Sequence, residues 1–212
     1  IATGHYAIVD RRGGRYRLRR GIDESRDQSY MLYRLDQDQL SATILPLGRY
    51  QKTRVREMAR ESGLPAAETP ESQDLCFVPE GDYVEFLRGR APIEPGPILN
   101  LQGEIIGQHE GLPCYTVGQR RGLGIAADQP LYVVAANPDE NALIVGPLES
   151  VQRKVFPIRG LNWVSMAPPD PGEAVTADIE VRYRTTPIPA TVMVGSEGAV
   201  ANLAEPAVCA PG

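Results

Sequence analysis

The sequence contains little cysteine and histidine, and it has no long hydrophobic run. Three widely spaced cysteines, Cys76, Cys114 and Cys209, and only two histidines fit neither a zinc site nor a disulfide framework. No apolar run approaches the roughly 20 residues that cross a bilayer, and residues 1–25 lack the layout of a secretory signal. We therefore expect a cytoplasmic protein with no membrane association and no structural metal.

Glycine and proline are also too few for a disordered or collagen-like chain, at 21 and 19 of 212 residues. The net charge of -5 is unevenly distributed. Residues 1–90 hold 15 basic and 14 acidic side chains, whereas residues 91–212 hold 7 and 13. Such a balance argues against non-specific adhesion to nucleic acid, but it leaves room for a local basic patch.

A β-ribbon is predicted near the start of the chain, where Tyr6–Asp10 and Arg15–Arg19 alternate about Gly13-Gly14. Alternation places Arg15, Arg17 and Arg19 together on one face, as a row of exposed guanidinium groups. The row fits a solvated edge strand that resists aggregation. Contact with phosphate groups is the alternative interpretation.

Three helices are predicted before residue 90. Ser25–Gln28 has the S-x-x-Q form of a capping box, which predicts a helix beginning near Arg26. A second helix is expected from about Tyr50 to Ser62, with Val55, Met58 and Ala59 on its inner face. A third, short helix fits Asp82–Arg88.

From Gly89 onward, proline and short alternating runs predict an all-β region. Hairpins are expected over Ile98–Gln108 and Leu131–Val145. A strand with one wet face is expected from Ala177 through Arg184. We place domain boundaries near residues 90 and 152.

Cys76 is the most interesting of the three cysteines, because it lies in a polar segment between two predicted helices. It has no histidine within ten residues to lower its pKa, so spacing alone favours a buried structural cysteine over a reactive thiol. Cys114 and Cys209 fit small apolar positions. Gly122–Ala127 matches a G-x-G-x-x-A fingerprint, but Asp128-Gln129-Pro130 follows where a helix is required, so we interpret the match as accidental.

Six segments in this order resemble the tRNA-specific 2-thiouridylases, and the resemblance runs from residue 2 to residue 212. They are Ala2–Tyr6, Asp27–Tyr30, Pro46–Gly48, Glu71–Phe77, Tyr115–Arg120 with Gly122–Gly124, and Val181–Arg184. The chain begins with Ile1 rather than methionine and stops at Gly212. On this resemblance we expect a chain that is truncated at its N-terminus and slightly at its C-terminus.

The resemblance implies an α+β chain of three parts. Residues 1–90 would be the C-terminal part of a catalytic α/β domain of the ATP-pyrophosphatase type, carrying the β-ribbon, the helices and Cys76. Residues 91–152 would be a small central β-rich domain. Residues 153–212 would be an incomplete antiparallel β-barrel similar to one in elongation factors.

The function implied is that of a tRNA-uridine 2-sulfurtransferase using ATP and Mg²⁺. The C2 oxygen of the wobble uridine is adenylated, which improves a poor leaving group, and a persulfide on a loop cysteine then delivers sulfur. Cys76 matches the persulfide-bearing cysteine, which reverses the interpretation from spacing. The implied partners are tRNA with a wobble uridine and a sulfur-relay or cysteine desulfurase protein.

Further site residues follow from the same resemblance. Gly4 matches a position whose backbone lies against ATP, and His5 one that contacts tRNA. The tripeptide Arg26-Asp27-Gln28 matches a tRNA-contacting tripeptide, with arginine where the family commonly has lysine. Arg182 and Tyr183 match a barrel element that contacts tRNA; since a regular strand would place them on opposite faces, Arg182 is expected to point outward.

Two further residues implied by the family, a catalytic aspartate and the cysteine that forms a disulfide with the persulfide cysteine, match no position here. We therefore expect this polypeptide alone to be inactive in thiolation. The alternative is a non-catalytic RNA-binding module built on an elongation-factor-like barrel. A third hypothesis is an ATP-pyrophosphatase relative acting on a small molecule.

Overall fold

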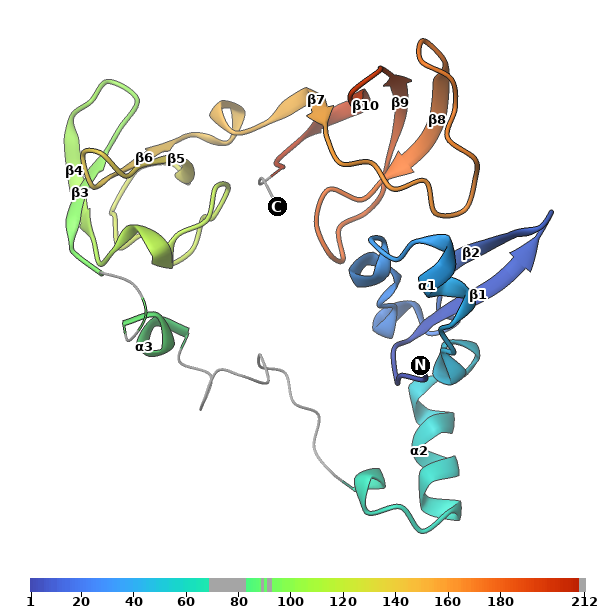
Figure 1. Ribbon diagram of the computed structural model, residues 1–212. Coiled ribbons are helices and arrows are strands. Elements are labelled where there is room, and N and C mark those ends of the chain that lie inside the picture. The colour runs from blue at the N-terminus through green and yellow to red at the C-terminus, as the bar shows by residue number, and fades with distance from the viewer. Residues whose placement is uncertain (69–82, 89, 91–92, 210–212) are drawn as a thin grey trace. The chain divides into compact units, whose positions relative to one another are not determined.

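A computed structural model describes residues 1–68, 83–88, 90 and 93–209 (Figure 1). The chain divides into two compact units. Unit 1 comprises residues 1–71, 158–174 and 193–199, and unit 2 comprises residues 72–157, 175–192 and 200–212. Both units therefore combine segments that are distant in the sequence. The boundaries expected near residues 90 and 152 stay predictions.

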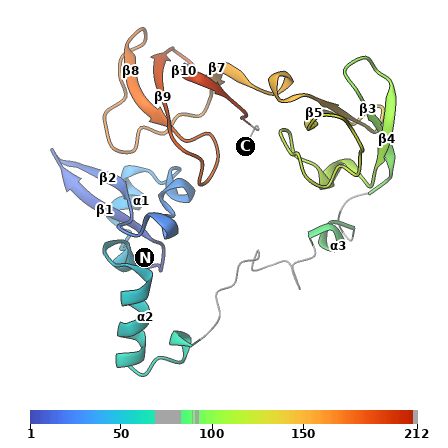
Figure 2. The ribbon, with the colours of Figure 1, turned by 180° about the vertical axis from the view of Figure 1, so that it is seen from behind.

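A two-stranded ribbon is the main β element of unit 1. Strands β1 (Ala7–Arg12) and β2 (Arg15–Arg20) pair antiparallel, with Ala7 opposite Arg20. Gly13 and Gly14 form the turn with φ values of 59° and 81°, a conformation that glycine adopts without steric cost. The tip of the ribbon extends outward in both views (Figures 1 and 2). The predicted ribbon is confirmed.

Two α-helices follow the ribbon in unit 1. Helix α1 (Gln37–Ser41) begins at a capping box in which the Asp36 side chain accepts from Gln39 N and the Gln39 side chain accepts from Asp36 N. Helix α2 (Lys52–Glu61) confirms the helix expected over residues 50–62. None of its side chains is buried in the described structure, so its apolar face is only partly covered.

The helix predicted to begin near Arg26 is wrong. Residues Glu24–Arg26 and Ser29–Leu32 form two separate 3₁₀ turns, and neither has a side-chain cap. The polar groups expected to cap that helix are used elsewhere. The Ser25 hydroxyl donates to Asp23, and the Gln28 side chain accepts from the backbone of Tyr6, 22 residues away.

Unit 2 contains the short helix α3 (Tyr83–Arg88) and a four-stranded sheet in the order β4-β3-β6-β5. The strands are β3 (Gly96–Leu99), β4 (Ile105–His109), β5 (Tyr132–Asn137) and β6 (Ala142–Gly146). β3 pairs antiparallel with β4 and parallel with β6, and β5 pairs antiparallel with β6. Both predicted hairpins and the predicted short helix are confirmed.

The core of this sheet comprises five buried apolar side chains, which are Ile98, Leu123, Val133, Leu143 and Val145. Four of them lie on the strands, where alternation turns them to one face. Leu123 comes from the loop before β5. That loop contains the G-x-G-x-x-A match and continues without a helix as far as β5, as expected for an accidental match.

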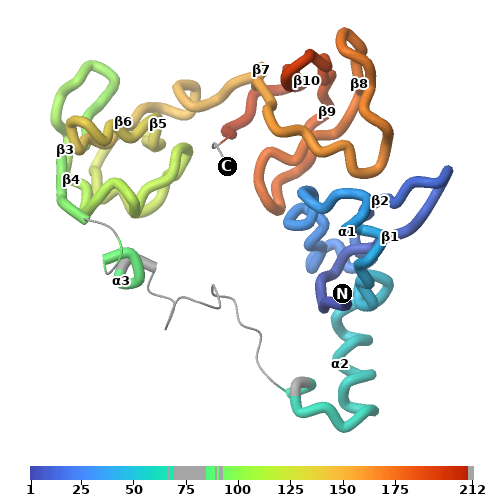
Figure 3. The backbone as a smooth tube through the Cα atoms, in the orientation of Figure 1, coloured from blue at the N-terminus to red at the C-terminus, as the bar shows by residue number. Residues whose placement is uncertain are grey.

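A second four-stranded sheet has the order β7-β10-β9-β8, and Figure 3 traces the backbone through it. Its strands are β7 (Arg153–Ile158), β8 (Ala174–Ile179), β9 (Ile188–Val194) and β10 (Ala199–Ala207). Ala190, Leu203 and Ala207 form a small buried core under it. Three sheets with few helices confirm the α+β class.

The strand expected over residues 177–184 ends at Ile179, so its second half is wrong. The next residues turn: Arg184 has a φ of 62°, and the backbone N–H of Thr185 donates to Arg182 O. The Glu180 carboxylate also accepts from Arg184 N at 2.7 Å. These local hydrogen bonds replace the ladder that alternation alone predicted.

Candidate functional site

The structure brings two of the predicted site segments together in unit 1. The Gln28 side-chain oxygen accepts from Tyr6 N at 3.0 Å, and Gln28 N donates to Tyr6 O at 2.9 Å. This reciprocal pair joins the segment containing Gly4 and His5 to the tripeptide Arg26–Gln28. The family resemblance predicted substrate contacts for both segments, but the sequence gave no reason to expect that they touch each other.

Asp27 fixes the shape of the tripeptide. Its Oδ1 accepts from Gly21 N at 2.7 Å, and its Oδ2 accepts from the Ser29 hydroxyl at 2.7 Å. Arg26 is half-buried, and its backbone N–H donates to Asp23 O. Asp27 and Gln28 therefore hold backbone groups of the segments that contain Gly21 and Tyr6.

Asp23 is a buried member of this cluster that sequence reasoning missed, with 7% of its surface exposed. It accepts from the Ser25 hydroxyl at 2.7 Å and from Lys52 N, at the first turn of α2, at 2.9 Å. These bonds, the Ser25 hydroxyl first, hold the pKa of Asp23 below its usual range. A carboxylate at a helix N-terminus satisfies an otherwise unpaired N–H group.

Gly4 is exposed, and His5 is half-buried with its Nδ1 at 2.8 Å from the Thr3 hydroxyl. A Cβ built on Gly4 would meet only Leu47 Cδ1, at 3.6 Å, which is an ordinary contact. Packing therefore does not require glycine here.

Gly48, in contrast, is required by packing. It is buried, and a Cβ on it would overlap the backbone carbonyl of Ala7 in β1. Its own carbonyl accepts from Ile22 N at 2.9 Å. The segment Pro46–Gly48 thus packs against β1 and accepts a hydrogen bond from Ile22, so its role in this cluster is structural.

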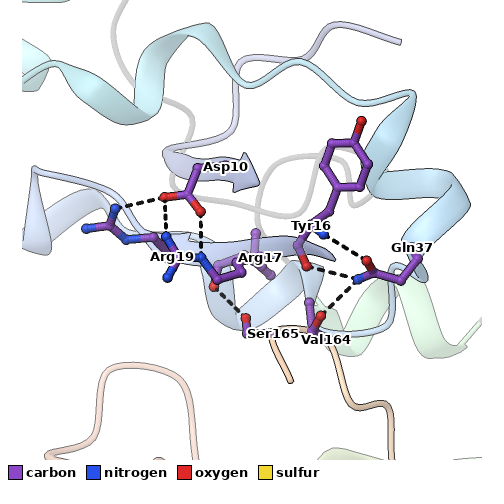
Figure 4. Close-up of polar contacts among 8 residues, drawn as sticks. Asp10, Tyr16, Arg17, Arg19, Gln37, Val164 and Ser165 are labelled. Atoms are coloured by element: carbon purple, nitrogen blue, oxygen red, sulfur yellow. Dashed lines mark hydrogen bonds and ion pairs between the residues drawn. The ribbon is translucent and has the colours of Figure 1, made fainter. Parts of the chain in front are cut away.

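The arginines of the ribbon are held by internal partners (Figure 4). Arg17 binds Asp10 with both Nε and Nη2, at 2.7 and 2.9 Å, and Arg19 Nη1 binds the same carboxylate at 2.9 Å. These two guanidinium groups lower the pKa of Asp10 to about 2. Arg15 donates to the carbonyl of Trp163. The predicted row of exposed guanidinium groups is therefore wrong for Arg15 and Arg17, which are half-buried.

Gln37 connects the ribbon to a segment more than 120 residues later (Figure 4). Its side chain accepts from Tyr16 N at 2.8 Å and donates to Tyr16 O at 3.0 Å and to Val164 O at 2.9 Å. The Ser165 hydroxyl also donates to Leu18 O. Residues 163–165 are thereby held along the ribbon by hydrogen bonds.

Cys76 lies outside the described residues, so its predicted role stays a prediction. Burial raises the pKa of Cys114, and the charge of Glu110 raises it further. Burial also raises the pKa of Cys209. Both thiols are therefore poor nucleophiles at neutral pH, as thiolate is the reactive form.

Arg182 does not point outward as expected. Its Nη2 donates to the carbonyl of Val117 at 2.6 Å, within unit 2. The neighbouring Arg184 guanidinium lies 5.0 Å from the centre of the Tyr183 ring. The outward direction predicted for Arg182 failed because it assumed a regular strand, whereas the chain turns at this point.

Metal and membrane features are scarce in the part of the chain that the structure describes. There, histidine, cysteine, aspartate and glutamate do not gather in groups of three or more that could hold a metal ion. Within the same residues, no helix has the length and apolar character needed to cross a membrane. A cavity of about 470 Å³ in unit 1 is lined by residues of β1, by Tyr16 and by residues 40, 41, 43–46 and 49, and none of the predicted site residues lines it.

Comparison with known proteins gives two domain matches and a set of close relatives. Residues 1–80 match the family described as tRNA methyl transferase HUP domain, and residues 84–147 match the tRNA methyl transferase PRC-barrel domain. The tRNA-specific 2-thiouridylase MnmA of Chloroflexus aurantiacus is 51% identical over 201 residues, which is 93% of this chain. The chain belongs to the tRNA-specific 2-thiouridylase family.

Other members of the family are nearly as similar. The 2-thiouridylases of Moorella thermoacetica and Nostoc punctiforme are 50% and 47% identical, over 90% and 91% of this chain. The chain spans about 55% of the length of the relatives it matches. The thiouridylase resemblance seen in six short motifs is thus confirmed along nearly the whole chain.

Proposed function

We propose that this chain takes part in 2-thiouridine synthesis at the wobble uridine of tRNA, as part of a tRNA-uridine 2-sulfurtransferase. The observation that carries the proposal is the reciprocal pair between Tyr6 and Gln28, since it joins the ATP-matching and tRNA-matching segments in one rigid cluster. Gly4, His5 and the tripeptide would then face the same substrate. The names of the relatives agree with this chemistry.

In the proposed reaction, Cys76 carries a persulfide. The thiolate of Cys76 attacks the terminal sulfur of a donor persulfide, and the donor leaves as its thiol. The terminal sulfur on Cys76 then attacks C2 of the uridine, and the activated oxygen leaves with AMP. A second thiol breaks the sulfur–sulfur bond and forms a disulfide with Cys76.

ATP with Mg²⁺ supplies the adenyl group that turns the C2 oxygen into a leaving group. The exposed backbone of Gly4 is the position proposed to lie against it. The described residues offer no cluster for Mg²⁺, so we assign the ion to no residue of this chain. His5, Arg26 and the turn containing Arg182 and Tyr183 are proposed to contact or position the tRNA.

The proposal also covers the fold of the C-terminal sheet, the cellular compartment and the sulfur donor. The sheet β7-β10-β9-β8 is proposed to belong to an antiparallel barrel similar to that of elongation factors. The proposed setting is the cytoplasm, with a cysteine desulfurase or sulfur-relay protein as donor. The raised pKa values of Cys114 and Cys209 support Cys76 as the sulfur-carrying residue.

Sulfur loading of the 212-residue chain tests this assignment directly. The chain is incubated with a cysteine desulfurase and cysteine, and bound sulfur is located by mass spectrometry of its peptides. We expect one added sulfur atom on Cys76, and none in the Cys76→Ser variant. Cys114→Ser and Cys209→Ser are the matched controls and should load normally. Equal loading of Cys76→Ser and the unmodified chain would contradict the proposal.

A second measurement separates catalysis from binding alone. In a protein of the relatives' full length, Cys76→Ser should abolish thiouridine formation while leaving tRNA affinity unchanged. A non-catalytic RNA-binding module would lose neither property. Thiouridine formation at the normal rate by Cys76→Ser would therefore favour the binding module.

A further inference from the structure

Two sequence motifs of unit 2 that lie far apart in the chain are in contact. The Arg182 guanidinium donates to Val117 O at 2.6 Å, across 65 residues. A Cβ on Gly118 would lie 2.6 Å from Arg182 Nη2, so the guanidinium lies directly against the backbone there. The turn Val181–Arg184 therefore supports the segment from Thr116 to Gly124, which we call the 116–124 loop.

Gln119 gives this loop its shape. Its Oε1 accepts from Thr116 N at 3.1 Å, and its Nε2 donates to Arg121 O at 2.9 Å. Its backbone N–H also donates to Thr116 O at 2.9 Å. The loop is thus held by hydrogen bonds on both sides of Arg120, which reduces the conformational entropy lost when a ligand binds.

Both ends of the loop are attached to the core of the sheet. Gly118 N donates to Val133 O at 2.7 Å, and Val133 N donates to Gln119 O at 2.9 Å, so the first half follows β5. Leu123 is 7% exposed and lies in the buried cluster with Ile98 and Leu143. The three residues between these anchors, Arg120, Arg121 and Gly122, are exposed.

The charge of these arginines is not neutralised within the described chain, where neither guanidinium forms an ion pair. Residues 91–212 hold only seven basic side chains, and four of them lie in the loop and the supporting turn. These four are Arg120, Arg121, Arg182 and Arg184. An acidic region therefore concentrates its positive charge at one place, as expected for a local phosphate-binding surface.

A cavity adjoins the arginines. Its volume is about 620 Å³, and it is lined by Arg120 and by residues 122–131. Cavities of roughly 300–1,000 Å³ commonly hold small ligands or parts of larger ones. Its lining combines the basic Arg120 and the acidic Asp128 with the apolar residues Ile125 and Leu131, so the apolar part suits a base and Arg120 marks the side on which a phosphate would lie.

We propose that the 116–124 loop is an RNA-binding element in which Arg120 and Arg121 contact backbone phosphates and Arg182 positions the loop. The inference rests on the proposed function, since it takes the partner to be tRNA. It changes the role proposed for Arg182 from direct contact with tRNA to positioning of the loop. Arginine suits the task because its planar guanidinium can bind a phosphate with two parallel hydrogen bonds.

The test measures binding of an unmodified tRNA transcript to the 212-residue chain by fluorescence anisotropy over a range of salt concentrations. Arg120→Gln with Arg121→Gln is compared with Arg153→Gln with Lys154→Gln, which removes the same charge from exposed positions on β7. We expect the loop variant to lose about tenfold or more in affinity. The slope of log Kd against log salt should fall by about 1.4–1.8, for two lost phosphate contacts.

Each outcome has a defined meaning. A loop variant with the affinity and salt slope of the β7 control overturns the role of the loop, while tRNA binding by the unmodified chain still supports the proposed function. Failure of the unmodified chain to bind tRNA at low salt overturns both. Arg120→Lys with Arg121→Lys should keep most of the salt slope, because phosphate contact depends on charge; a slope as low as that of the glutamine variant contradicts phosphate contact.

Discussion

The ribbon of unit 1 and the 116–124 loop of unit 2 both carry closely spaced arginines, but they use them differently. In the ribbon, Arg17 and Arg19 share the Asp10 carboxylate and Arg15 is bound to a backbone carbonyl. In the loop, Arg120 and Arg121 are exposed, and within the described residues neither forms an ion pair. Internal partners thus engage Arg15, Arg17 and Arg19 of the ribbon, whereas the guanidinium groups of the loop are open to a ligand.

This difference shows that the number of basic residues in a segment is a poor measure of its capacity to bind nucleic acid. Asp10 neutralises part of the ribbon and at the same time stiffens it, because a carboxylate that binds two guanidinium groups restrains both side chains. The loop obtains its rigidity from the neutral amide Gln119 instead. The backbone of the loop is therefore restrained while the charges of Arg120 and Arg121 stay available to a phosphate group.

The largest expected effect is a loss of stability that is confined to one of the two units. Gly48→Ala should destabilise unit 1 by more than about 3 kcal/mol, because the new Cβ overlaps the Ala7 carbonyl and neither backbone can move aside. Trp163, the only tryptophan and a residue of unit 1, reports the loss by fluorescence during urea unfolding.

The matched variant is Gly96→Ala, whose Cβ would overlap the Asn141 carbonyl in unit 2. It should leave the Trp163 transition in place while destabilising the sheet β4-β3-β6-β5. If Gly96→Ala also abolished the Trp163 transition, the ribbon and the loop could not be treated as parts of separately stabilised units.

A smaller effect is expected on amide exchange in the 116–124 loop when Arg182 is replaced. Arg182→Met removes the donor to Val117 O, so the loop should open more often and its amides should exchange with solvent about tenfold faster or more. Mass-spectrometric hydrogen exchange over residues 116–124 measures this. Arg159→Met, at an exposed position, is the control. Unchanged exchange in Arg182→Met would show that the loop is rigid without its support.

Removing the neutralising carboxylate should make the ribbon resemble the loop. Asp10→Asn releases Arg17 and Arg19, so tRNA binding should strengthen severalfold and the salt slope should steepen by up to about 1.4–1.8. Asp38→Asn removes one acidic charge at an exposed position and should have little effect. Equal behaviour of the two variants would mean that Asp10 does not mask the ribbon.

The smallest effect is the pH dependence of the Asp10 cluster. The folded pKa of about 2 lies below the ordinary value of 3.8, so the ion pairs stabilise the ribbon fully above about pH 4 and are lost as the pH falls toward 2. Carboxyl NMR titration should give a midpoint near 2, and Arg17→Gln should raise it. A midpoint at or above 3.8 in the unmodified chain would contradict the cluster.

Local signals were sufficient for much of this fold. The Gly13-Gly14 turn, the helix ending before Gly63 and both hairpins of unit 2 were predicted correctly, because neighbouring residues alone determine them. The helix expected near Arg26 failed for the opposite reason. Its capping groups are taken by Tyr6 and Asp23, and no spacing rule shows a contact across 22 residues.

The sequence motifs proposed residues for the candidate site but not their arrangement. The roles given to His5, Arg26–Gln28 and Arg182 stay predictions, and the direction predicted for Arg182 is wrong because a turn replaces the strand. Asp23 and Arg121 were missed altogether. The sequence did offer a signal for Asp23, since an aspartate just before a polar turn often caps a helix. The helix whose N–H group it binds, however, begins 29 residues later, at Lys52.

Gln37 has a consequence for synthesis of the chain on the ribosome. Its side chain holds Val164 across 127 residues, and Asn162 holds Tyr33 across 129. At about 5–20 residues per second, roughly 6–25 seconds pass between the emergence of the two partners. A ribbon that folds during that interval does so without the contacts to Val164 and Asn162, and it is held by its own antiparallel ladder, the Gly13-Gly14 turn and the Asp10 ion pairs.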